Sequence, residues 1–439
     1  MLSTRIAAWL GARHVHYCWV VVAATFLTML ATAGTLSAPG VMIVPLQHEF
    51  GWQTADISSA LAVRLALYGL VAPFAAALLN RYGLRPVIAA ALLLIVAGVT
   101  ASFAMSQVWQ LVLFWGVLCG LGSGMIAMVL GATVATRWFA HRRGLVIGML
   151  TASTATGQLV FLPLLAALTE RYGWRPAMCV VVGALLATLV LVQLLMRDRP
   201  SDLDLPPYGD TATTPAPPQE HGFLTLVRSP LVALRDASGS WTFWVLFGTF
   251  FVCGLSTNGL IQTHWITLCG DFGMAPVGAA GMLALIGVFD LGGTIMSGWL
   301  SDRYDNRWLL FWYYGLRGLS LLYLPFSGFT LVGLSLFAVF YGLDWIATVP
   351  PTVRMTAERF GAGRANLVFG WIFTAHQLGA ATAAFGAGAT RDAFASYLPA
   401  LFVAGAFCLG AAGLVLTIGR RLRAPALAAG GSAAIPDAW

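Results

Sequence analysis

The segment Gly298-Trp299-Leu300-Ser301-Asp302-Arg303-Tyr304-Asp305-Asn306-Arg307 is a short charged stretch between two long apolar runs. Runs of about 20 apolar residues have the length needed to cross about 30 Å of hydrocarbon. The segment is therefore predicted to form a tight turn between two membrane helices. A shorter version, Asn80-Arg81-Tyr82-Gly83-Leu84-Arg85, precedes it in the chain, and Arg81 is as far from Arg303 as Arg85 is from Arg307.

The interval between Arg81 and Arg303, which we call the repeat interval, also relates other identical residues along most of the chain. These pairs are Trp19 with Trp241, Gly120 with Gly342, Arg137 with Arg359, Arg142 with Arg364, Gly148 with Gly370 and Gly157 with Gly379. Chance does not keep one register over such a length. We therefore predict that the chain consists of two copies of one half, which is a statement about the fold.

The composition places most of the chain in lipid. Hydrophobic residues make up 59% of the 439 residues, charged residues make up 9%, and the mean hydropathy is +0.81. A water-soluble chain of this length would need more charge to cover its surface. All 24 basic residues are arginine, and the six cysteines show no metal-ligand spacing. We therefore expect arginine or protonated histidine at any cationic site, and neither a metal nor a cofactor.

Apolar runs long enough to span a membrane occur twelve times, in two groups of six. They cover residues 17–46, 55–79, 85–104, 108–135, 144–167, 175–196, 241–268, 275–300, 308–326, 329–352, 364–389 and 396–418. The predicted fold is an all-α integral membrane protein of 12 transmembrane helices in two pseudo-symmetric six-helix bundles.

Arginine placement predicts the orientation in the membrane. If the N-terminus is inside, 19 arginines fall in cytoplasmic segments, three in external loops, and two, Arg64 and Arg317, within spans. Positive residues are enriched in cytoplasmic loops. Both termini are therefore predicted to be cytoplasmic, in a multi-pass protein of the inner (plasma) membrane. This placement also explains the net charge of +7 without nucleic-acid binding.

The chain divides into four predicted regions. Residues 1–196 form the N-terminal bundle, 197–240 a cytoplasmic linker, 241–423 the C-terminal bundle and 424–439 a disordered tail. The linker centre, 202–220, is rich in Pro, Asp and Thr and is predicted to be mobile. The alternation of apolar residues with Arg228 and Arg235 over 223–235 predicts a helix on the inner membrane surface, or alternatively a docking helix for a partner protein.

Gly298, Asp302, Arg303 and Arg307 match the Gly-x-x-x-Asp-Arg-x-x-x-Arg loop of the major facilitator superfamily, which the whole chain resembles. The pattern from Ser37 to Trp52 and the segments 137–144 and 172–175 are similar to its monocarboxylate-transporter-like branch. The resemblance implies a major facilitator fold, a central cavity near the midplane and alternating access by rocking of one bundle against the other.

Three departures from that branch concern charged positions. Asn80 replaces the acid of the first loop, and the chain has no lysine where the branch carries one in the first helix. Four residues after the acid of the eighth span, Asp290, the branch commonly has an arginine, whereas this chain has Thr294. A simple lactate- or pyruvate-like substrate is therefore in doubt.

Ionisable residues within the spans are functional candidates because a charge in hydrocarbon is costly. Arg64, with Tyr68 one turn deeper, is predicted to anchor the negative group of a substrate; alternatively it pairs with an acid or a carbonyl, or snorkels outward. Asp290 and Arg317 either form a buried ion pair or take part in proton coupling. Asp344 is either a proton-responsive acid or a structural hydrogen-bonding group.

Uncharged polar residues in the spans are weaker candidates for substrate binding. They are Asn258, Gln262, Trp371, His376 and Gln377. Asn258 and Gln262 are four apart and share a helix face, and Asn258-Gly259 is a plausible local break. The glycines at 116, 120 and 124 are interpreted as close helix packing.

The predicted gating loops contain six polar residues. They are Asn80, Arg81 and Arg85 in the first half and Asp302, Arg303 and Arg307 in the second.

The chain lacks the phosphate-binding Walker loop, the His-Glu-x-x-His motif and the nucleophile elbow, so neither ATP-driven pumping nor an enzyme is expected. The favoured hypothesis is a secondary active transporter of a small organic anion or aromatic or heteroaromatic metabolite, with protons as co-substrate (symport). An exporter of drug-like or neutral aromatic compounds and a transporter-like receptor that does not transport are the alternatives. A monomer in the bilayer is expected.

Overall fold

The computed structural model describes residues 2–126, 128–140, 142–210 and 223–419. The predicted disordered tail and most of the predicted mobile linker lie outside these residues. Within them the chain is almost entirely helical, with one isolated β-bridge between Phe139 and Tyr208.

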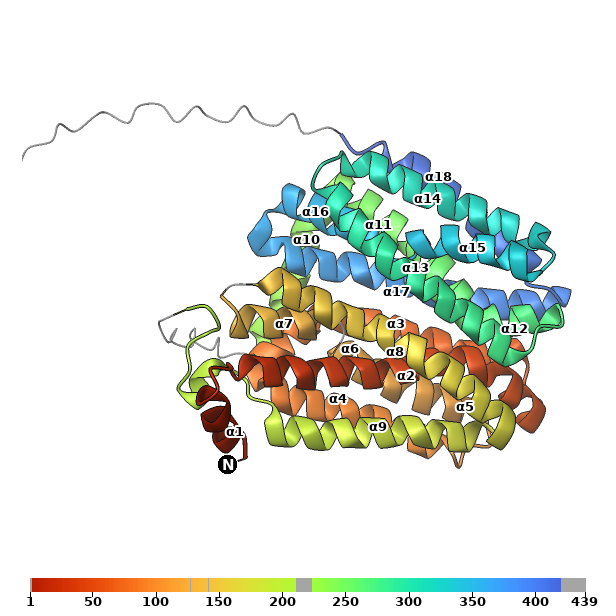
Figure 1. The fold of residues 1–439 in the computed structure, drawn as a ribbon. Coiled ribbons are helices and arrows are strands. Elements are labelled where there is room, and N and C mark those ends of the chain that lie inside the picture. The colour runs from red at the N-terminus through yellow and green to blue at the C-terminus, as the bar shows by residue number, and fades with distance from the viewer. Residues whose placement is uncertain (1, 127, 141, 211–222, 420–439) are drawn as a thin grey trace, which may run out of the picture.

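The first half contains the helices numbered α1 to α9 in Figure 1. They are α1 (Leu2–Gly11), α2 (Cys18–Phe50), α3 (Thr54–Tyr82), α4 (Leu84–Ser102), α5 (Val108–Leu111), α6 (Cys119–Met125), α7 (Met128–Trp138), α8 (Arg143–Tyr172) and α9 (Trp174–Leu195). A π-helical segment, η1 (Val112–Leu118), joins α5 to α6, and a 3₁₀ turn, η2 (Pro200–Leu203), follows α9.

The second half begins with a connecting helix and contains the remaining elements. They are α10 (Phe223–Ser238), α11 (Trp241–Gly254), the π-helical η3 (Leu255–Gln262), α12 (Thr263–Asp271), α13 (Pro276–Ser301), α14 (Asn306–Tyr323), the 3₁₀ turn η4 (Leu324–Ser327), α15 (Leu331–Asp344), α16 (Val349–Phe360), α17 (Ala362–Phe394) and α18 (Leu398–Val415).

The two halves form two stacked helical layers, with α1–α9 in one and α10–α18 in the other (Figure 1). At the interface α3 packs against α17, and α8 packs against α13. Helix α13 is the repeat equivalent of α3, and α17 is the repeat equivalent of α8. The contacts α3–α17 and α8–α13 are therefore related by the pseudo-symmetry of the two halves. The predicted pair of pseudo-symmetric bundles is therefore confirmed.

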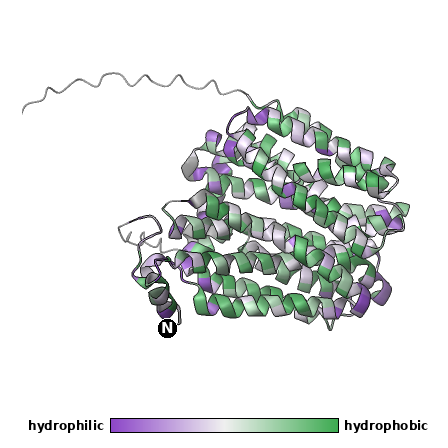
Figure 2. Cartoon of the chain, viewed as in Figure 1, coloured by the Kyte–Doolittle hydropathy of each residue, from purple (hydrophilic) through white to green (hydrophobic). Residues whose placement is uncertain are grey.

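Ten helical stretches are long and apolar enough to cross a membrane, counting continuous runs such as α5–α7 as one and considering the described residues only. The remaining two of the twelve predicted spans coincide with α14 and α17. Helix α14 carries Arg307 and Arg317, and α17 carries His376 and Gln377 between the two halves, so both are less apolar. Figure 2 shows hydrophobic helix bodies with hydrophilic residues gathered at both ends of the bundles.

The linker differs from the sequence prediction at its beginning. The composition of residues 202–210 predicts mobility, but the Tyr208 amide donates to the Trp138 carbonyl at 2.8 Å and the Ala140 amide donates to the Tyr208 carbonyl at 3.0 Å. The Tyr208 ring also packs against Trp19 and Phe139. Tyr208 and the apolar side chains of Leu203 and Leu205, which also pack against the core, therefore dock this segment on the N-terminal bundle.

Helix α10 covers the segment for which a surface helix was predicted, and it packs against the C-terminal bundle. The Pro230 carbonyl accepts a hydrogen bond from the Trp371 indole at 2.8 Å, and Asp236 pairs with Arg364 at 2.9 Å. Ala233 and Ala237 are buried. One face of α10 is thus covered by protein, which leaves the other face for the predicted membrane surface.

Candidate substrate-binding cavity

A cavity of about 1900 Å³ lies between the two halves and is lined by both of them. We call the end of the molecule with the loops after α3, α7 and α13 the arginine-rich end, because it carries Arg81, Arg137 and Arg303. Residues Asn80 and Arg137 line the cavity, as do parts of the segment 199–210. The cavity therefore opens at the arginine-rich end.

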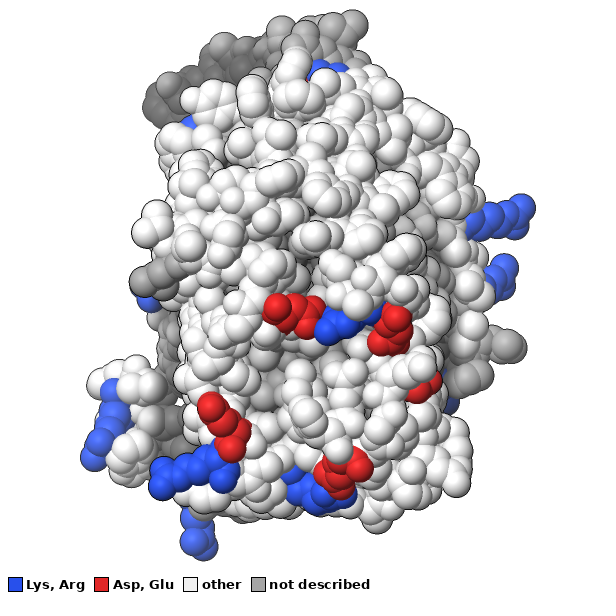
Figure 3. Space-filling model, turned by 90° about the vertical axis from the view of Figure 1, so that its right-hand side faces the viewer, with Lys and Arg blue, Asp and Glu red and all other residues white. Residues whose placement is uncertain are grey.

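The opposite end of the molecule is closed by contacts between the halves. The Asp392 carboxylate accepts hydrogen bonds from the backbone amides of Thr54 at 3.2 Å and Ala55 at 2.6 Å, at the start of α3. A carboxylate at a helix N-terminus is stabilised by the free amides and the helix dipole. Figure 3 shows this end, where acidic groups lie next to basic groups. Two ion pairs in the structure are Asp271–Arg391 at 2.7 Å and Glu49–Arg175 at 2.6 Å.

Arg64 lies on α3 and lines the cavity, with only 4% of its surface exposed. Its Nη1 donates to the Thr35 carbonyl at 2.6 Å and its Nη2 to the Thr35 hydroxyl at 3.2 Å. Its Nε has no partner, and no ion pair among the described residues includes Arg64. The guanidinium is therefore a buried cation whose protein contacts are all neutral.

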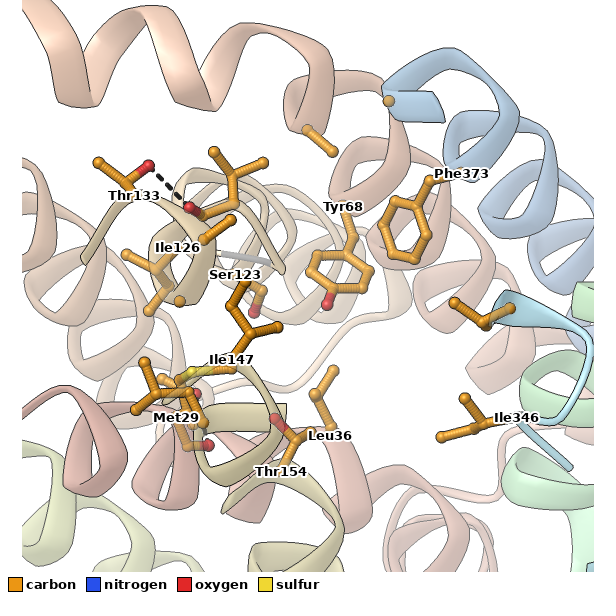
Figure 4. Close-up of a pocket in the computed structure, with 18 of the residues that line it drawn as sticks. Met29, Leu36, Tyr68, Ser123, Ile126, Thr133, Ile147, Thr154, Ile346 and Phe373 are labelled. Carbon is orange, nitrogen blue, oxygen red and sulfur yellow. Dashed lines mark hydrogen bonds between the residues drawn. The ribbon is translucent and has the colours of Figure 1, made fainter. Parts of the chain in front are cut away.

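Tyr68 lies one turn further along α3 and forms an aromatic wall with the second half. Its ring meets Phe373 of α17 edge to face, with 5.7 Å between the ring centroids (Figure 4). Phe373 in turn stacks on His376 at 5.9 Å and 10°. Such a wall offers π-faces and ring edges to a planar ligand.

The predicted polar residues of α17 and η3 divide into two groups. Asn258, Gln262, His376 and Gln377 line the cavity, whereas Trp371 does not, because its indole is held by the Pro230 carbonyl. In place of the predicted local break at Asn258-Gly259, the chain forms a π-helical segment, η3, that continues α11 into α12, and the Asn258 carbonyl accepts from the Thr263 hydroxyl at 2.7 Å. Gln377 Oε1 and His376 Nδ1 are buried without protein partners among the described residues.

Asp290 of α13 lines the cavity on the side of the second half. Its Oδ1 accepts from the Thr294 hydroxyl at 3.1 Å and from the Ile346 amide at 2.8 Å. No ion pair within the described part of the chain includes Asp290. The cavity thus contains a cation from one half, Arg64, and a carboxyl group from the other, and neither has a charged partner among these residues.

The predicted ion pair between Asp290 and Arg317 is wrong, because Arg317 pairs with Asp344 instead. Its Nε lies 2.8 Å from Asp344 Oδ2, and both side chains are buried away from the cavity. Its Nη2 donates to the carbonyls of Asp344 and Trp345, where α15 is interrupted. Arg317 therefore satisfies carbonyls that the end of α15 leaves free, and Asp290 binds the Ile346 amide of the same interruption.

The predicted gating residues are tied to their own halves. Asn80 accepts from Arg137 at 2.8 Å, Arg85 donates to Gln193 at 2.8 Å, and Arg307 pairs with Asp305 at 2.6 Å. Asp302 pairs with Arg354 at 2.5 Å, and the Arg303 guanidinium lies 4.1 Å from the centre of the Trp299 ring. Arg81 lies over the ring of Tyr82. This pattern fits a structure whose arginine-rich end is open.

We expect Asp302→Asn to slow turnover while leaving the fold intact. The Asp302–Arg354 pair is exposed, and such pairs contribute about 0–1 kcal/mol to stability. Asp302 also lies at the C-terminal end of α13, where the helix dipole disfavours a carboxylate. We therefore expect Asp302 to stabilise the state in which the arginine-rich end is closed. The variant should then favour the open state, with ligand still bound.

The check is turnover in liposomes at matched protein amounts, together with solvent accessibility of a cysteine introduced at the cavity mouth. Glu170→Gln is the control, because Glu170 is an exposed acid near the C-terminal end of α8, away from the gating loops, and forms no ion pair among the described residues. Unchanged turnover of Asp302→Asn would contradict a gating role.

Comparison with known proteins places the chain in a family. A sequence profile of the Major Facilitator Superfamily matches residues 22–384. Monocarboxylate transporter 13 of Rattus norvegicus is 29% identical over 409 residues, which cover 91% of this chain and 88% of that protein. The uncharacterized MFS-type transporter YcxA of Bacillus subtilis (strain 168) is 24% identical, covering 87% and 90%. The solved structure of the xylose transporter XylE from E. coli superposes with a TM-score of 0.68 at 15% identity, covering 92% and 100%.

The chain therefore belongs to the major facilitator superfamily. It is an integral membrane transporter, similar in sequence to monocarboxylate transporters, and not an enzyme.

Three polar residues at the cavity and its closed end were not predicted from the sequence. Thr35 orients Arg64, Asp392 helps to close the far end, and Ser123 lines the cavity with a hydroxyl that has no partner in the described part of the chain. Ser123 stands inside the glycine pattern of α6, which was interpreted as packing alone. The available signal in the sequence was a serine between two glycines in a membrane-spanning segment.

Proposed function

We propose that this protein is a secondary active transporter that moves a small organic anion with an aromatic or heteroaromatic body across the inner (plasma) membrane. It works by alternating access and is coupled to protons. The arginine-rich end faces the cytoplasm, as the placement of arginines favours, so the cavity described above is open to the inside.

The observation that carries the proposal is the buried Arg64 guanidinium. A buried cation normally requires a paired anion, and the ion pairs of the described residues leave Arg64 without one. Its free Nε points to a missing acceptor. An anionic ligand in the cavity would supply both the counter-charge and a charge-assisted hydrogen bond.

The aromatic lining supports a planar ligand body. Tyr68, Phe373 and His376 form a continuous set of ring contacts between the two halves. A ligand that binds Arg64 through its carboxylate and packs against these rings would contact both halves at once. Ligand binding would then favour their closure around it.

Proton coupling is proposed from charge balance within the cavity. An ionised Asp290 carboxylate is attracted to the Arg64 guanidinium across the cavity. The same carboxylate repels an anionic ligand that is bound to Arg64. Protonation of Asp290 removes that repulsion while its Thr294 and Ile346 bonds can keep the side chain in place. Anion and proton would then bind together and be released together.

The test is uptake into proteoliposomes under an imposed pH gradient, using a panel of aromatic and aliphatic monocarboxylates beside their carboxamides. Wild-type protein should accumulate a carboxylate when the outside is acidic. Asp290→Asn should lose this accumulation but keep exchange of labelled for unlabelled carboxylate, because a permanently neutral group mimics the protonated state. Glu170→Gln, which changes an exposed acid outside the cavity and away from both gating loops, should behave as wild type.

Other outcomes would favour the alternatives. Equal transport of carboxylate and carboxamide without an effect of pH would favour an exporter of neutral aromatic compounds. Ligand binding without any transport would favour a receptor. Either result would overturn the proposal.

A further inference from the structure

Helices α3 and α6 form one wall of the cavity, and two glycines bring their backbones together. A Cβ at Gly120 would lie 3.0 Å from the Arg64 carbonyl oxygen, and one at Gly124 would lie 2.8 Å from Val71 Cβ and 3.2 Å from the Tyr68 carbonyl oxygen. A larger residue at either position would push against α3 and force it or its side chains to shift. The glycines therefore fix α6 against α3 beside Arg64 and Tyr68.

Ser123 lies between these two contacts and faces the cavity. It is only 3% exposed, and its hydroxyl has no hydrogen-bond partner among the described residues. In Figure 4, Ser123 and the Tyr68 ring point toward the same open space. Within the described part of the chain, the buried unpaired hydroxyls are those of Ser58, Ser123, Thr169, Thr267, Tyr313 and Tyr314, and of these only Ser123 lines the cavity.

Most hydroxyls in these helices behave differently. Thr28, Ser37 and Thr156, for example, donate to the carbonyl four residues earlier, at 2.8, 3.0 and 2.8 Å. Such a bond satisfies a hydroxyl inside a helix without any tertiary partner. Ser123 does not make this bond, so its donor remains free at the cavity surface.

In the second half, polar groups at the equivalent place bind side chains of the protein. Gly342 packs against the Ile286 carbonyl as Gly120 packs against that of Arg64, and the repeat interval relates one pair to the other. Both helices are then interrupted, after Met125 in the first half and after Asp344 in the second. In the second half Asp290 and Arg317 bind polar groups of the interruption. In the first half the equivalent positions hold Tyr68 and Ile95.

We propose that Ser123 is a direct ligand-binding residue, which donates a hydrogen bond to the carboxylate of the substrate beside Arg64. This inference rests on the proposed function, since it assigns a second donor to the same anion site. Arg64 supplies charge and Ser123 supplies a short, directional donor from a helix whose position the glycines fix.

The test measures binding of benzoate and of benzamide to the purified full-length protein by calorimetry. Ser123→Ala should weaken benzoate binding by about tenfold, because a hydrogen bond to a charged group is lost. It should leave benzamide binding nearly unchanged. Ser37→Ala is the matched control, since Ser37 also lines the cavity and is equally buried, but its hydroxyl already donates to Ala33. It should change neither affinity.

A second variant keeps the test independent of small changes in affinity. Ser123→Cys places a thiol at the same position, and bound benzoate should slow its alkylation by N-ethylmaleimide relative to the background of the native cysteines. Benzamide at equal occupancy should protect less. Absence of protection while benzoate remains bound would overturn the inference.

The outcomes separate this inference from the proposed function. If wild-type protein binds benzoate no better than benzamide, the anion site itself is overturned and Ser123 loses its role with it. If the preference for benzoate is lost in Arg64→Gln but unchanged in Ser123→Ala, the anion site stands and the inference on Ser123 is wrong.

Discussion

Replacing Arg317 by leucine should prevent most of the protein from folding. The substitution leaves the Asp344 carboxylate buried without its counter-charge and frees the carbonyls of Asp344 and Trp345 at the end of α15. Breaking a buried ion pair on one side costs about 3–5 kcal/mol, a large part of the about 5–15 kcal/mol that stabilises a typical protein. The measurement is the yield of monodisperse protein and its melting temperature in detergent.

The double variant Arg317→Leu with Asp344→Leu should recover part of this loss, because no unpaired charge remains. Recovery should be incomplete, since the Trp345 carbonyl is still without its donor. Arg364→Leu is the matched control: it removes an arginine from the exposed pair with Asp236, where a change of about 0–1 kcal/mol is expected. Normal folding of the single Arg317 variant would contradict a structural role for the pair.

Replacing Arg64 by glutamine should weaken the binding of anionic ligands by a factor of about ten or more, equivalent to about 1.4 kcal/mol. Glutamine keeps polar atoms near Thr35 but removes the charge that attracts a carboxylate. Arg64→Lys should recover only part of the affinity, because lysine presents a point charge in place of a planar fork. Calorimetry with benzoate, or with the best carboxylate of the transport panel, gives the ratio directly.

Arg81→Gln is the matched control for Arg64, because Arg81 also lines the cavity but lies at its exposed mouth. Its removal should change affinity little, since solvent screens the charge there. The melting temperature of each variant without ligand separates lost binding from lost folding. Equal affinity of wild type and Arg64→Gln would move the anion site elsewhere in the cavity.

The internal repeat and the run of apolar spans were sufficient to predict the architecture. Hydrophobic length determines which segments cross the membrane, and the constant register between the halves determines that they form similar bundles. The same reading singled out Arg64, Asp290, Arg317 and Asp344, because a charge in a span is costly wherever the helices pack. These features depend only on the order of residues along the chain.

The partners of those charged residues were decided by the tertiary structure. A helix that is apolar on all sides carries no periodic pattern that sets its rotation about its own axis, so the sequence cannot tell which neighbour a buried arginine faces. Arg317 therefore faces Asp344 and the interrupted end of α15, while Asp290, predicted as its partner, faces the cavity. Close packing of backbones decides this rotation.

Ser123 shows the same limit at the proposed anion site. The glycines at 120 and 124 predict close packing, and they do pack on α3. Which residue that packing turns toward the cavity depends on the crossing of α6 with α3 and on the interruption after Met125. Composition and repeat thus determined a two-bundle membrane protein with rare buried charges, whereas helix rotation and backbone contact decided which of those charges stayed unpaired in the cavity.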